Sequence, residues 1–347
     1  MVRIAFVAPL TGPEAVVGLP MKETVELALR EAQGEGRCSE QVELIALDDQ
    51  ADPAKARALA ARLVRDETVV GVVGHKNSGP SAAAGPLYSD AGLAQITPSA
   101  TNSELARQDW RTFFRMCADN DSQANAAARF AAEELGVHNV CAVHDGTGYG
   151  RPLADTFLDA VRGYGIDVAL VEEIHLGQRD FQDTALALLE ADSDLVYLGL
   201  TEIESSFLVR AMRDAGVRSL CLGADGGRQS PFPQLAGEAA EGVYETYAGM
   251  DPQSTERGRS LLEACEGAYG ACPIFGAEAY DAAYVLLEAL RRAPVPGRSS
   301  VLQAIKEMEA LVGVTGPISF TSSGNRRRAA VTIWQVRDGQ MVPISTV

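Results

Sequence analysis

The chain has 347 residues, 46% of them hydrophobic, so it can bury substantial cores and is long enough for two domains of ordinary size. Its 47 acidic and 30 basic residues give a net charge of −17, which disfavours binding to nucleic acid or to anionic membrane surfaces. No stretch approaches the roughly 18 to 20 consecutive apolar residues that a membrane-spanning helix needs. The sequence therefore predicts two domains and no membrane span.

The N-terminal residues and the cysteines give only weak signals. Residues 1–7 run directly into a strand pattern, so we expect an export signal either to be absent or to have been removed. Six cysteines are too few for a disulfide scaffold, and no Cys-x-x-Cys pair indicates a zinc or redox site. Cys265 and Cys272 are close enough in sequence to bridge, but both could equally be small buried apolar residues.

Short apolar runs alternate with amphipathic segments along the first third of the chain. In order, the pattern predicts a strand at 4–8, a helix at 20–33, a strand at 42–47, a helix from Pro53 to about 65, a strand at 69–73, a helix at 79–90 and a strand at 94–97. A less regular stretch follows at 109–117.

The alternation then restarts and continues through the second third. It predicts a helix at 122–135, a strand at 139–144, a helix at 149–162, strands at 168–174 and 195–200, a helix at 202–215 and a strand at 219–222. The last elements are helices at 253–269, 276–292 and 301–308 and strands at 329–336 and 341–345.

Two separate series of strand–helix units predict two similar α/β lobes with parallel-rich sheets, and the late elements are expected to complete them. Ligands of such sheets bind beyond the carboxyl ends of the strands, where free backbone N–H groups of helix starts collect. This rule selects five loops as the candidate site: 9–18, 74–80, 97–102, 145–150 and 223–228.

Three of these loops carry polar groups that could meet a charged ligand. Ser78 stands at the start of a helix as a candidate N-cap, where the positive end of the helix favours a carboxylate, although it could be an ordinary capping serine. Residues 97–102 form a second strand-end cluster of hydroxyl residues, which alone is just a polar turn. Asp225 follows a strand and could meet an ammonium group, or form an Asx-turn.

Catalytic and cofactor signals are weak. The glycine-rich loop at 144–150 superficially resembles a dinucleotide turn, but the third glycine of that fingerprint would fall at Arg151. The sequence has no Gly-x-Ser-x-Gly nucleophile elbow. Its four histidines, at 75, 138, 144 and 175, show neither metal-ligand spacing nor an obvious nucleophile partner. We therefore expect no enzyme activity and no cofactor.

Five motifs at these loops, taken in order and spacing, resemble the periplasmic leucine/isoleucine/valine-binding family over almost the whole chain. They are Ala-Pro-Leu-Thr-Gly-Pro at 8–13, Asp-Asp-Gln-Ala-Asp-Pro at 48–53, Gly-His at 74–75 leading to Ser78, Thr-Pro-Ser-Ala-Thr-Asn-Ser-Glu-Leu at 97–105, and His-Asp at 144–145 leading to Tyr149 and Gly150. The resemblance implies a type I fold of two doubly wound α/β lobes joined by a three-segment hinge. The expected lobes are 1–118 with 249–323, and 119–248 with 324–347.

The resemblance also implies roles for individual residues. Ser78, Ala100 and Thr101, with Ser99 in the same cluster, would hold the α-carboxylate of an amino acid. Tyr149 and Asp225 would meet its ammonium group, although the best-known relatives have Glu at the position of Asp225.

The positions that would face the ligand's side chain depart from the family pattern. Val17 and Thr201 replace aromatic residues, whereas Phe275 keeps a ring. The family's preference for aliphatic amino acids as ligands therefore does not transfer directly to this chain. A disulfide of some relatives would join the positions of Ala51 and Asn77 and is absent here.

The function that the resemblance implies is capture of an amino acid, branched-chain or related, between the two lobes and its delivery to an ABC importer. The expected protein is periplasmic or extracytoplasmic, a monomer without a cofactor, and its partners are the importer's membrane permease subunits. The alternative is a sensing or regulatory domain of the same fold, which the lack of an upstream secretory signal or lipid-anchor cysteine would favour. An enzyme acting on amino acids or nucleotides is a third class, disfavoured by the missing catalytic groups.

Overall fold

The computed structural model describes residues 2–347 except 35, 37–41, 228–229 and 310. The chain forms two compact units, Met1–Ala118 with Pro252–Ala329, and Asp119–Asp251 with Ala330–Val347. The sequence-based boundaries after 248 and 323 fall a few residues earlier than these. Residues 324–329 belong with the first unit because Asn325 and Arg326 bond to Arg115 and Thr315 there.

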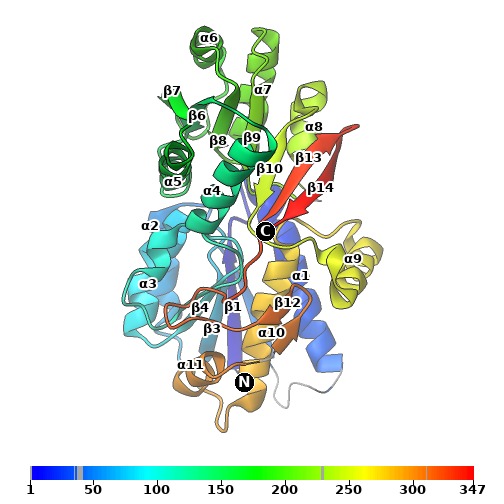
Figure 1. Cartoon of the computed structure of the whole chain (residues 1–347). Coiled ribbons are helices and arrows are strands. Elements are labelled where there is room, and N and C mark those ends of the chain that lie inside the picture. The colour runs from blue at the N-terminus through cyan, green and yellow to red at the C-terminus, as the bar shows by residue number, and fades with distance from the viewer. Residues whose placement is uncertain (1, 35, 37–41, 228–229, 310) are drawn as a thin grey trace. The chain divides into compact units, whose positions relative to one another are not determined.

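The first unit is built on a five-stranded parallel sheet of order β2-β1-β3-β4-β5 (Figure 1). Its strands are β1 (Val2–Ala8), β2 (Val42–Asp48), β3 (Val69–Gly74), β4 (Ala94–Thr97) and β5 (Phe113–Arg115). Its helices are α1 (Ala15–Gly34), α2 (Pro53–Leu63), α3 (Ser78–Asp90), α9 (Glu256–Tyr269), α10 (Gly276–Arg292) and α11 (Arg298–Lys306), with short 3-10 turns η1 (Ser103–Ala106) and η4 (Pro252–Ser254). A small hairpin pairs β11 (Leu311–Gly313) with β12 (Gly316–Ile318).

Helices cover both faces of this sheet. On one face, α2 and α3 bury a cluster with β1 and β3 that includes Val7, Val72 and Tyr88. On the other face, α1 and α10 pack together, and α10 approaches β3 so closely that a Cβ on Gly71 would lie 2.5 Å from a Leu286 methyl carbon. Figure 1 shows the two helical layers on either side of the strands.

The second unit has a seven-stranded sheet of order β14-β13-β10-β9-β8-β6-β7, parallel from β10 to β7 and antiparallel at β13 and β14. Its strands are β6 (Asn139–His144), β7 (Asp167–Glu173), β8 (Leu195–Gly199), β9 (Leu220–Ala224), β10 (Tyr244–Tyr247), β13 (Thr332–Arg337) and β14 (Gln340–Thr346). Its helices are α4 (Asn120–Arg129), continued by a π-helical turn η2 (Phe130–Glu134), α5 (Gly150–Gly163), α6 (Gln182–Ala191), α7 (Glu202–Asp214) and α8 (Phe232–Ala236), with a 3-10 turn η3 (Gly237–Ala240).

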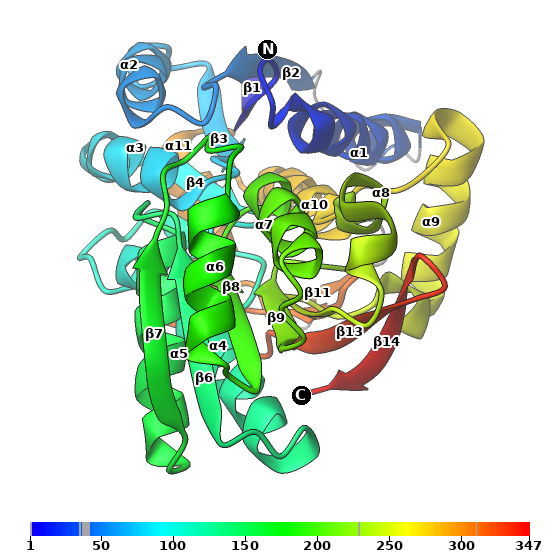
Figure 2. The same cartoon turned by 90° about the horizontal axis from the view of Figure 1, so that it is seen from above.

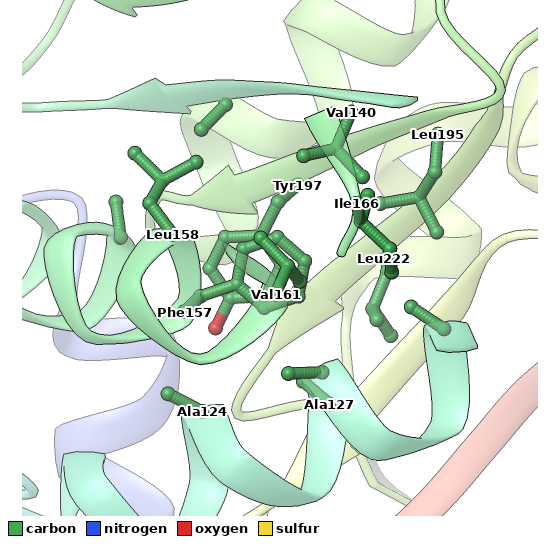
Figure 3. Packing of buried hydrophobic residues seen from close by; sticks show 14 of the residues in the cluster. Ala124, Ala127, Val140, Phe157, Leu158, Val161, Ile166, Leu195, Tyr197 and Leu222 are labelled. Atoms are coloured by element: carbon green, nitrogen blue, oxygen red, sulfur yellow. The ribbon is translucent and has the colours of Figure 1, made fainter. Parts of the chain in front are cut away.

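The core of the second unit lies between its sheet and helices α4 and α5 (Figure 3). Phe157 of α5 stacks on Tyr197 of β8, with ring centroids 3.8 Å apart and planes 6° from parallel. Because strand side chains alternate, Val196 and Leu198 point to the opposite face. Helices α6 and α7 pack against each other in the same unit (Figure 2). The predicted α/β class with parallel-rich sheets is confirmed.

Several elements differ from the sequence prediction, among them α1, α6 and β10. Helix α1 begins at Ala15 and contains Pro20 in its interior, whereas the sequence predicts a helix that starts at this proline. Helix α6 was not predicted, and neither was β10, whose four residues Tyr-Glu-Thr-Tyr are too few for a clear pattern. β10 forms because β9 and β13 supply hydrogen-bonding partners on both of its sides.

Replacing Phe157 with alanine is expected to lower the free energy of unfolding of the protein by about 3–5 kcal/mol, because the side chain is fully buried against Tyr197. Urea denaturation followed by circular dichroism measures the loss. The control is Phe207→Ala on α7, whose half-buried ring lies under the Arg179 guanidinium. Equal losses in the two variants would show that the stack is not a principal element of this core.

Candidate functional site

In the first unit, the start of α3 lies directly after the fully buried strand β3. The expectation that Ser78 is the N-cap is wrong. Asn77 has the extended backbone of an N-cap and Ser78 is the first helical residue, so the helix begins one residue earlier than predicted. Ser78 is buried, and its Oγ accepts a hydrogen bond of 3.3 Å from the backbone N–H of Asn102. That bond ties the 97–102 loop to the helix start.

The hydroxyl residues after β4 are fixed by local hydrogen bonds. Thr97 Oγ1 donates to the carbonyl of His75 at 2.7 Å and accepts from the N–H of Ala100 at 2.9 Å. Ser99 Oγ donates to the carbonyl of Lys76 at 3.0 Å. The two strand-end loops that the sequence selected separately therefore form one hydrogen-bonded surface in this unit.

Arg115, which the sequence does not single out, also holds the 97–102 loop in place. It is fully buried, and its Nη1 donates to the carbonyls of Ala100 at 3.0 Å and Asn102 at 2.8 Å. Its Nε and Nη2 donate to Asn325 Oδ1 at 3.2 and 2.6 Å. Thr101, between the two held carbonyls, is fully buried. No local sequence signal could have revealed this role of Arg115, because its partner Asn325 is 210 residues away in the chain.

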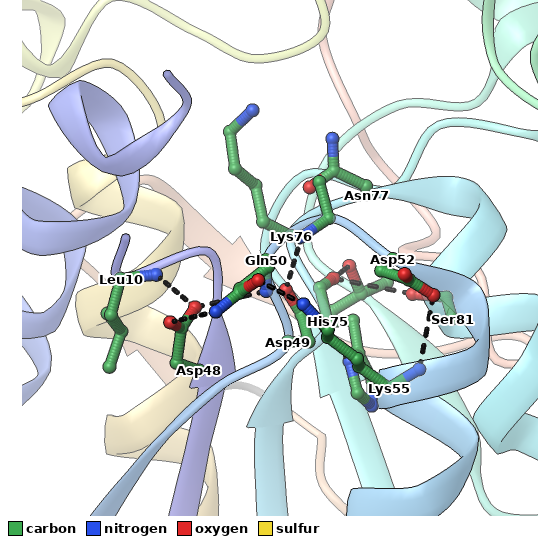
Figure 4. Close-up of polar contacts among 12 residues, drawn as sticks. Leu10, Asp48, Asp49, Gln50, Asp52, Lys55, His75, Lys76, Asn77 and Ser81 are labelled. Carbon is green, nitrogen blue, oxygen red and sulfur yellow. Dashed lines mark hydrogen bonds and ion pairs between the residues drawn. The ribbon is translucent and has the colours of Figure 1, made fainter. Parts of the chain in front are cut away.

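A buried polar chain supports the β3–α3 loop (Figure 4). His75 Nδ1 lies 2.6 Å from Asp49 Oδ2, and its Nε2 lies 3.2 Å from Tyr88 Oη. Burial, together with the negative charge of Asp49, raises the pKa of Tyr88. The His75 carbonyl accepts from Ser81 as well as from Thr97. These contacts give His75 a positioning role rather than a catalytic one.

The first loop of the unit is held by Asp48 at the end of β2. Its carboxylate accepts from the Leu10 N–H at 2.8 Å, from Thr11 Oγ1 at 2.5 Å and from the Gln50 N–H at 3.0 Å. Burial acts to raise the pKa of Asp48, but these hydrogen bonds outweigh it and the pKa is lowered. Asp48 is therefore an anion that fastens the loop, as Figure 4 shows.

Val17 and Phe275, the two side-chain positions of this unit, are both buried at about 4% exposure. Val17 lies in the first turns of α1, and Phe275 is the N-cap of α10. Phe275 has a φ of 55°, a left-handed conformation that is unusual for an aromatic residue. Such strain is concentrated at functional positions, although it does not itself identify a ligand.

In the second unit, Asp225 follows β9 with a φ of 60°. Its Oδ1 accepts a hydrogen bond of 2.9 Å from Gln123 Nε2, and Gln123 also donates to Thr246 Oγ1 at 2.9 Å. Asp225 is therefore held by a helix α4 side chain and not only by its own turn. Gln123 was not selected from the sequence.

Tyr149 and Asp225 are brought together at the carboxyl ends of β6 and β9. Burial raises the pKa of Tyr149 well above its ordinary value, and so do the charge of Asp225 and its side-chain hydrogen bond to Tyr149. Tyr197, deeper in the core, has its pKa raised by burial and by the same carboxylate. The Tyr197 hydroxyl has no hydrogen-bond partner within the described part of the chain.

Thr201, the third predicted position of this unit, is the N-cap of α7, and its hydroxyl donates to Glu204. Nearby, Asp145 accepts from the Thr147 N–H at 3.0 Å and hydroxyl at 2.7 Å through Oδ1. Burial raises the pKa of Asp145, and the charge of Glu204 adds to the effect while the Thr147 bonds oppose it. The carboxyl edge of this sheet is thus strongly acidic.

Other sequence expectations concern metals, membranes and cysteines. Among the residues that the structure describes, no three His, Cys, Asp or Glu side chains are grouped to hold a metal ion. None of the helices within the same residues has the length and apolar character to cross a bilayer. Cys265 and Cys272 are both buried free thiols. Residue 228, the end of the candidate loop 223–228, lies outside the described residues.

Comparisons with known proteins agree with the fold. The family model described as periplasmic binding protein matches residues 1–340. The chain is 29% identical over 340 residues to Leu/Ile/Val-binding protein homolog 2 of Brucella abortus, covering 98% of this chain and 91% of that protein. It is 28% identical to the leucine-, isoleucine-, valine-, threonine- and alanine-binding protein of Pseudomonas aeruginosa, covering 96% and 89%. Among solved structures, a leucine-binding protein of Thermotoga maritima matches with a TM-score of 0.92 at 25% identity, covering 100% and 99%.

Proposed function

Because the chain belongs to the family of periplasmic binding proteins, we propose that it captures an α-amino acid outside the cytoplasm and delivers it to the membrane permease of an ABC importer. The names of its relatives support an amino-acid ligand, since one is a leucine-, isoleucine-, valine-, threonine- and alanine-binding protein and another is a Leu/Ile/Val-binding protein homologue. Proteins of this kind bind and release their ligand unchanged, so the function requires no catalytic residue and no cofactor.

The observation that carries the proposal is the Asp225 carboxylate at the carboxyl edge of the second unit's sheet. Gln123 and Tyr149 hold this carboxylate by hydrogen bonds. An anion that is fixed in place and partly desolvated is suited to an ammonium group, which is itself costly to remove from water unless it is paired. Asp225 and Tyr149 are the proposed ammonium site.

The proposed carboxylate site lies in the first unit, at the start of α3. There the positive end of the helix favours an anion, and Ser78 offers a hydroxyl. Ser99, Ala100 and Thr101 belong to the loop tied to Ser78 through Asn102. Val17, Phe275 and Thr201 are proposed to meet the ligand's side chain.

Hinge closure is the proposed mechanism. The chain passes between the two units three times, after Ala118, Asp251 and Ala329. Because the proposed ligand contacts come from both units, the ligand would favour the closed conformation, and the permease would recognise that conformation. We propose that the protein acts as a monomer in this cycle.

A thermal-shift screen over the common amino acids and small carboxylates tests the function. A ligand present at about 100 times its dissociation constant stabilises the native protein by roughly 2.7 kcal/mol, which raises the melting temperature measurably. An α-amino acid is expected to produce the largest shift, and its methyl ester and its N-acetyl derivative are expected to produce none. A largest shift from a carboxylate without an ammonium group would contradict the proposal.

Replacing Ser78 with alanine is expected to weaken amino-acid binding by roughly ten- to a hundredfold. A hydrogen bond to a charged group contributes about 1.5–3 kcal/mol, and each 1.4 kcal/mol is a factor of ten in affinity. Isothermal titration calorimetry measures the change. Ser89→Ala, in the last turn of the same helix α3, is the matched control and is expected to bind normally. Unchanged affinity in a stable Ser78→Ala protein would place the carboxylate elsewhere.

A further inference from the structure

Cys265 and Cys272 are two cysteines of the first unit that the proposed function does not use. Cys265 lies on α9, and Cys272 lies in the short segment between α9 and α10. The two residues are 0% and 3% exposed, and both belong to one apolar cluster that also includes Ala277 of α10. The fold therefore buries together two thiols that stand close to each other in the sequence.

A left-handed turn at the end of α9 brings Cys272 back toward Cys265. Gly270 has a φ of 85°, and its N–H donates to the carbonyl of Glu266 at 3.1 Å. Glycine adopts this conformation at little steric cost and is common at helix ends for that reason. A helix that continued through residue 272 would separate the two cysteines by about 10 Å along its axis. The turn is therefore what lets the two sulfurs meet.

The two thiols are hydrogen-bonded to each other. This bond lowers the pKa of Cys265 and raises the pKa of Cys272, and burial acts to raise the pKa of both. The proton of the pair is therefore held on Cys272. Cys265 is the thiol that becomes a thiolate more readily, and the thiolate is the form of cysteine that attacks a disulfide.

The start of α10 fixes the Cys272 sulfur from another side. A Cβ on Gly276, the first residue of α10, would lie 3.0 Å from Cys272 Sγ and 2.8 Å from the ring of Pro273. The Gly276 N–H donates to the Pro273 carbonyl at 2.9 Å. The first turn of α10 therefore limits the directions in which Cys272 can turn away from Cys265.

We propose that Cys265 and Cys272 become joined by a disulfide bond while the chain folds outside the cytoplasm. The family of periplasmic binding proteins, to which the chain belongs, works in a compartment where disulfides form and persist. The bond would fasten the end of α9 to the segment that leads into Phe275 and α10. Because both sulfurs are buried in the folded unit, the oxidant has to reach them before folding is complete. The inference does not depend on which ligand the protein binds.

The oxidant is the disulfide of a thiol–disulfide oxidoreductase, or oxidised glutathione in the test tube. The Cys265 thiolate attacks one sulfur of that disulfide, and the other sulfur leaves and takes up the proton that Cys265 has lost. Cys272 then loses its proton and attacks the Cys265 sulfur of the mixed disulfide, which releases the second sulfur of the oxidant. The protein gives up two electrons and two protons, and the oxidant receives them as two thiols.

Refolding of the reduced, urea-unfolded chain with oxidised glutathione tests the proposal. Mass spectrometry of the whole protein is expected to show a loss of about 2 Da, and peptide mapping is expected to show a bond between Cys265 and Cys272. Oxidised glutathione added to the folded, reduced protein should form the bond at least roughly tenfold more slowly, because the sulfurs are buried. Equal rates in the two experiments would overturn the coupling to folding. Six free thiols after refolding, or a bond between other cysteines in its place, would overturn the proposal itself.

Thermal unfolding of the protein refolded with and without oxidised glutathione gives a second readout. The bond restricts the unfolded chain, so the oxidised protein is expected to melt at a temperature higher by roughly 4–8 °C. Cys265→Ala and Cys272→Ala should each abolish this difference, whatever their own effect on stability. Cys141→Ala, which removes a buried free thiol of β6 in the second unit, is the matched control and should keep it. A difference that persists in Cys265→Ala would contradict the assignment.

Discussion

Removing the charge of Asp225 is expected to weaken amino-acid binding by at least roughly a hundredfold. In the closed protein an ammonium group left without its anion retains a large desolvation penalty. Breaking such a buried pair by removing one partner typically costs about 3–5 kcal/mol, and each 1.4 kcal/mol is tenfold in affinity. Calorimetric titration with the amino acid found in the thermal-shift screen measures the effect.

The backbone at Asp225 decides which variant is most informative. With a φ of 60°, this position tolerates Asp and Asn better than other residues, so Asp225→Ala combines loss of charge with backbone strain. Asp225→Asn removes the charge and keeps both the size and the conformational tolerance. Asp225→Glu keeps the charge but lengthens the side chain, and we expect a milder loss if the site can accept one methylene.

A matched control is available in the same unit. Asp192, the C-cap of α6, is also left-handed, with a φ of 44°, and it is exposed. Asp192→Asn should leave binding unchanged. Near-native binding by Asp225→Asn would mean that the ligand carries no ammonium group or that another residue receives it.

The sequence predicted the elements whose pattern is local. Strands β1, β3, β6 and β8 are continuous apolar runs followed by helices, as expected for parallel sheets covered on both faces. The loops after these strands could be selected because the carboxyl ends of parallel strands define where ligands bind. Asp225 and Ser78 were found by this rule alone, before any resemblance was considered.

Residues whose role depends on distant partners could not be found in this way. Glu245 lies in Tyr-Glu-Thr-Tyr, whose alternation is typical of a half-exposed strand. It is 2% exposed, and the turn at Gly226 lies against its carboxylate, which no local pattern reports. Arg115 fell in a stretch that looked irregular, since β5 has only three residues. Its partner Asn325 comes from the far end of the chain.

Arg115 gives the second large effect that we expect. Arg115→Met should lower the free energy of unfolding of the protein by at least about 3 kcal/mol, because hydrogen bonds to a charged group contribute roughly 1.5–3 kcal/mol each and three acceptors lose their donor. The carbonyls of Ala100 and Asn102 would be left without this donor, so the loop proposed to hold the ligand's carboxylate should relax. We therefore expect weaker amino-acid binding at temperatures where the variant is still folded.

Urea denaturation and calorimetric titration measure these two consequences separately. Arg115→Lys should restore little of the lost stability or affinity. The guanidinium of Arg115 reaches two carbonyls and the Asn325 amide oxygen with its forked N–H groups, and a single ammonium group cannot do so. Arg107→Met, which breaks an exposed pair with Glu104 close by in sequence, is the control and should change stability by less than about 1 kcal/mol. If Arg115→Met lost stability but bound the ligand with native affinity, the hydrogen bonds of Ser78, Thr97 and Ser99 would suffice to hold the 97–102 loop, and Arg115 would be a core residue with no part in binding.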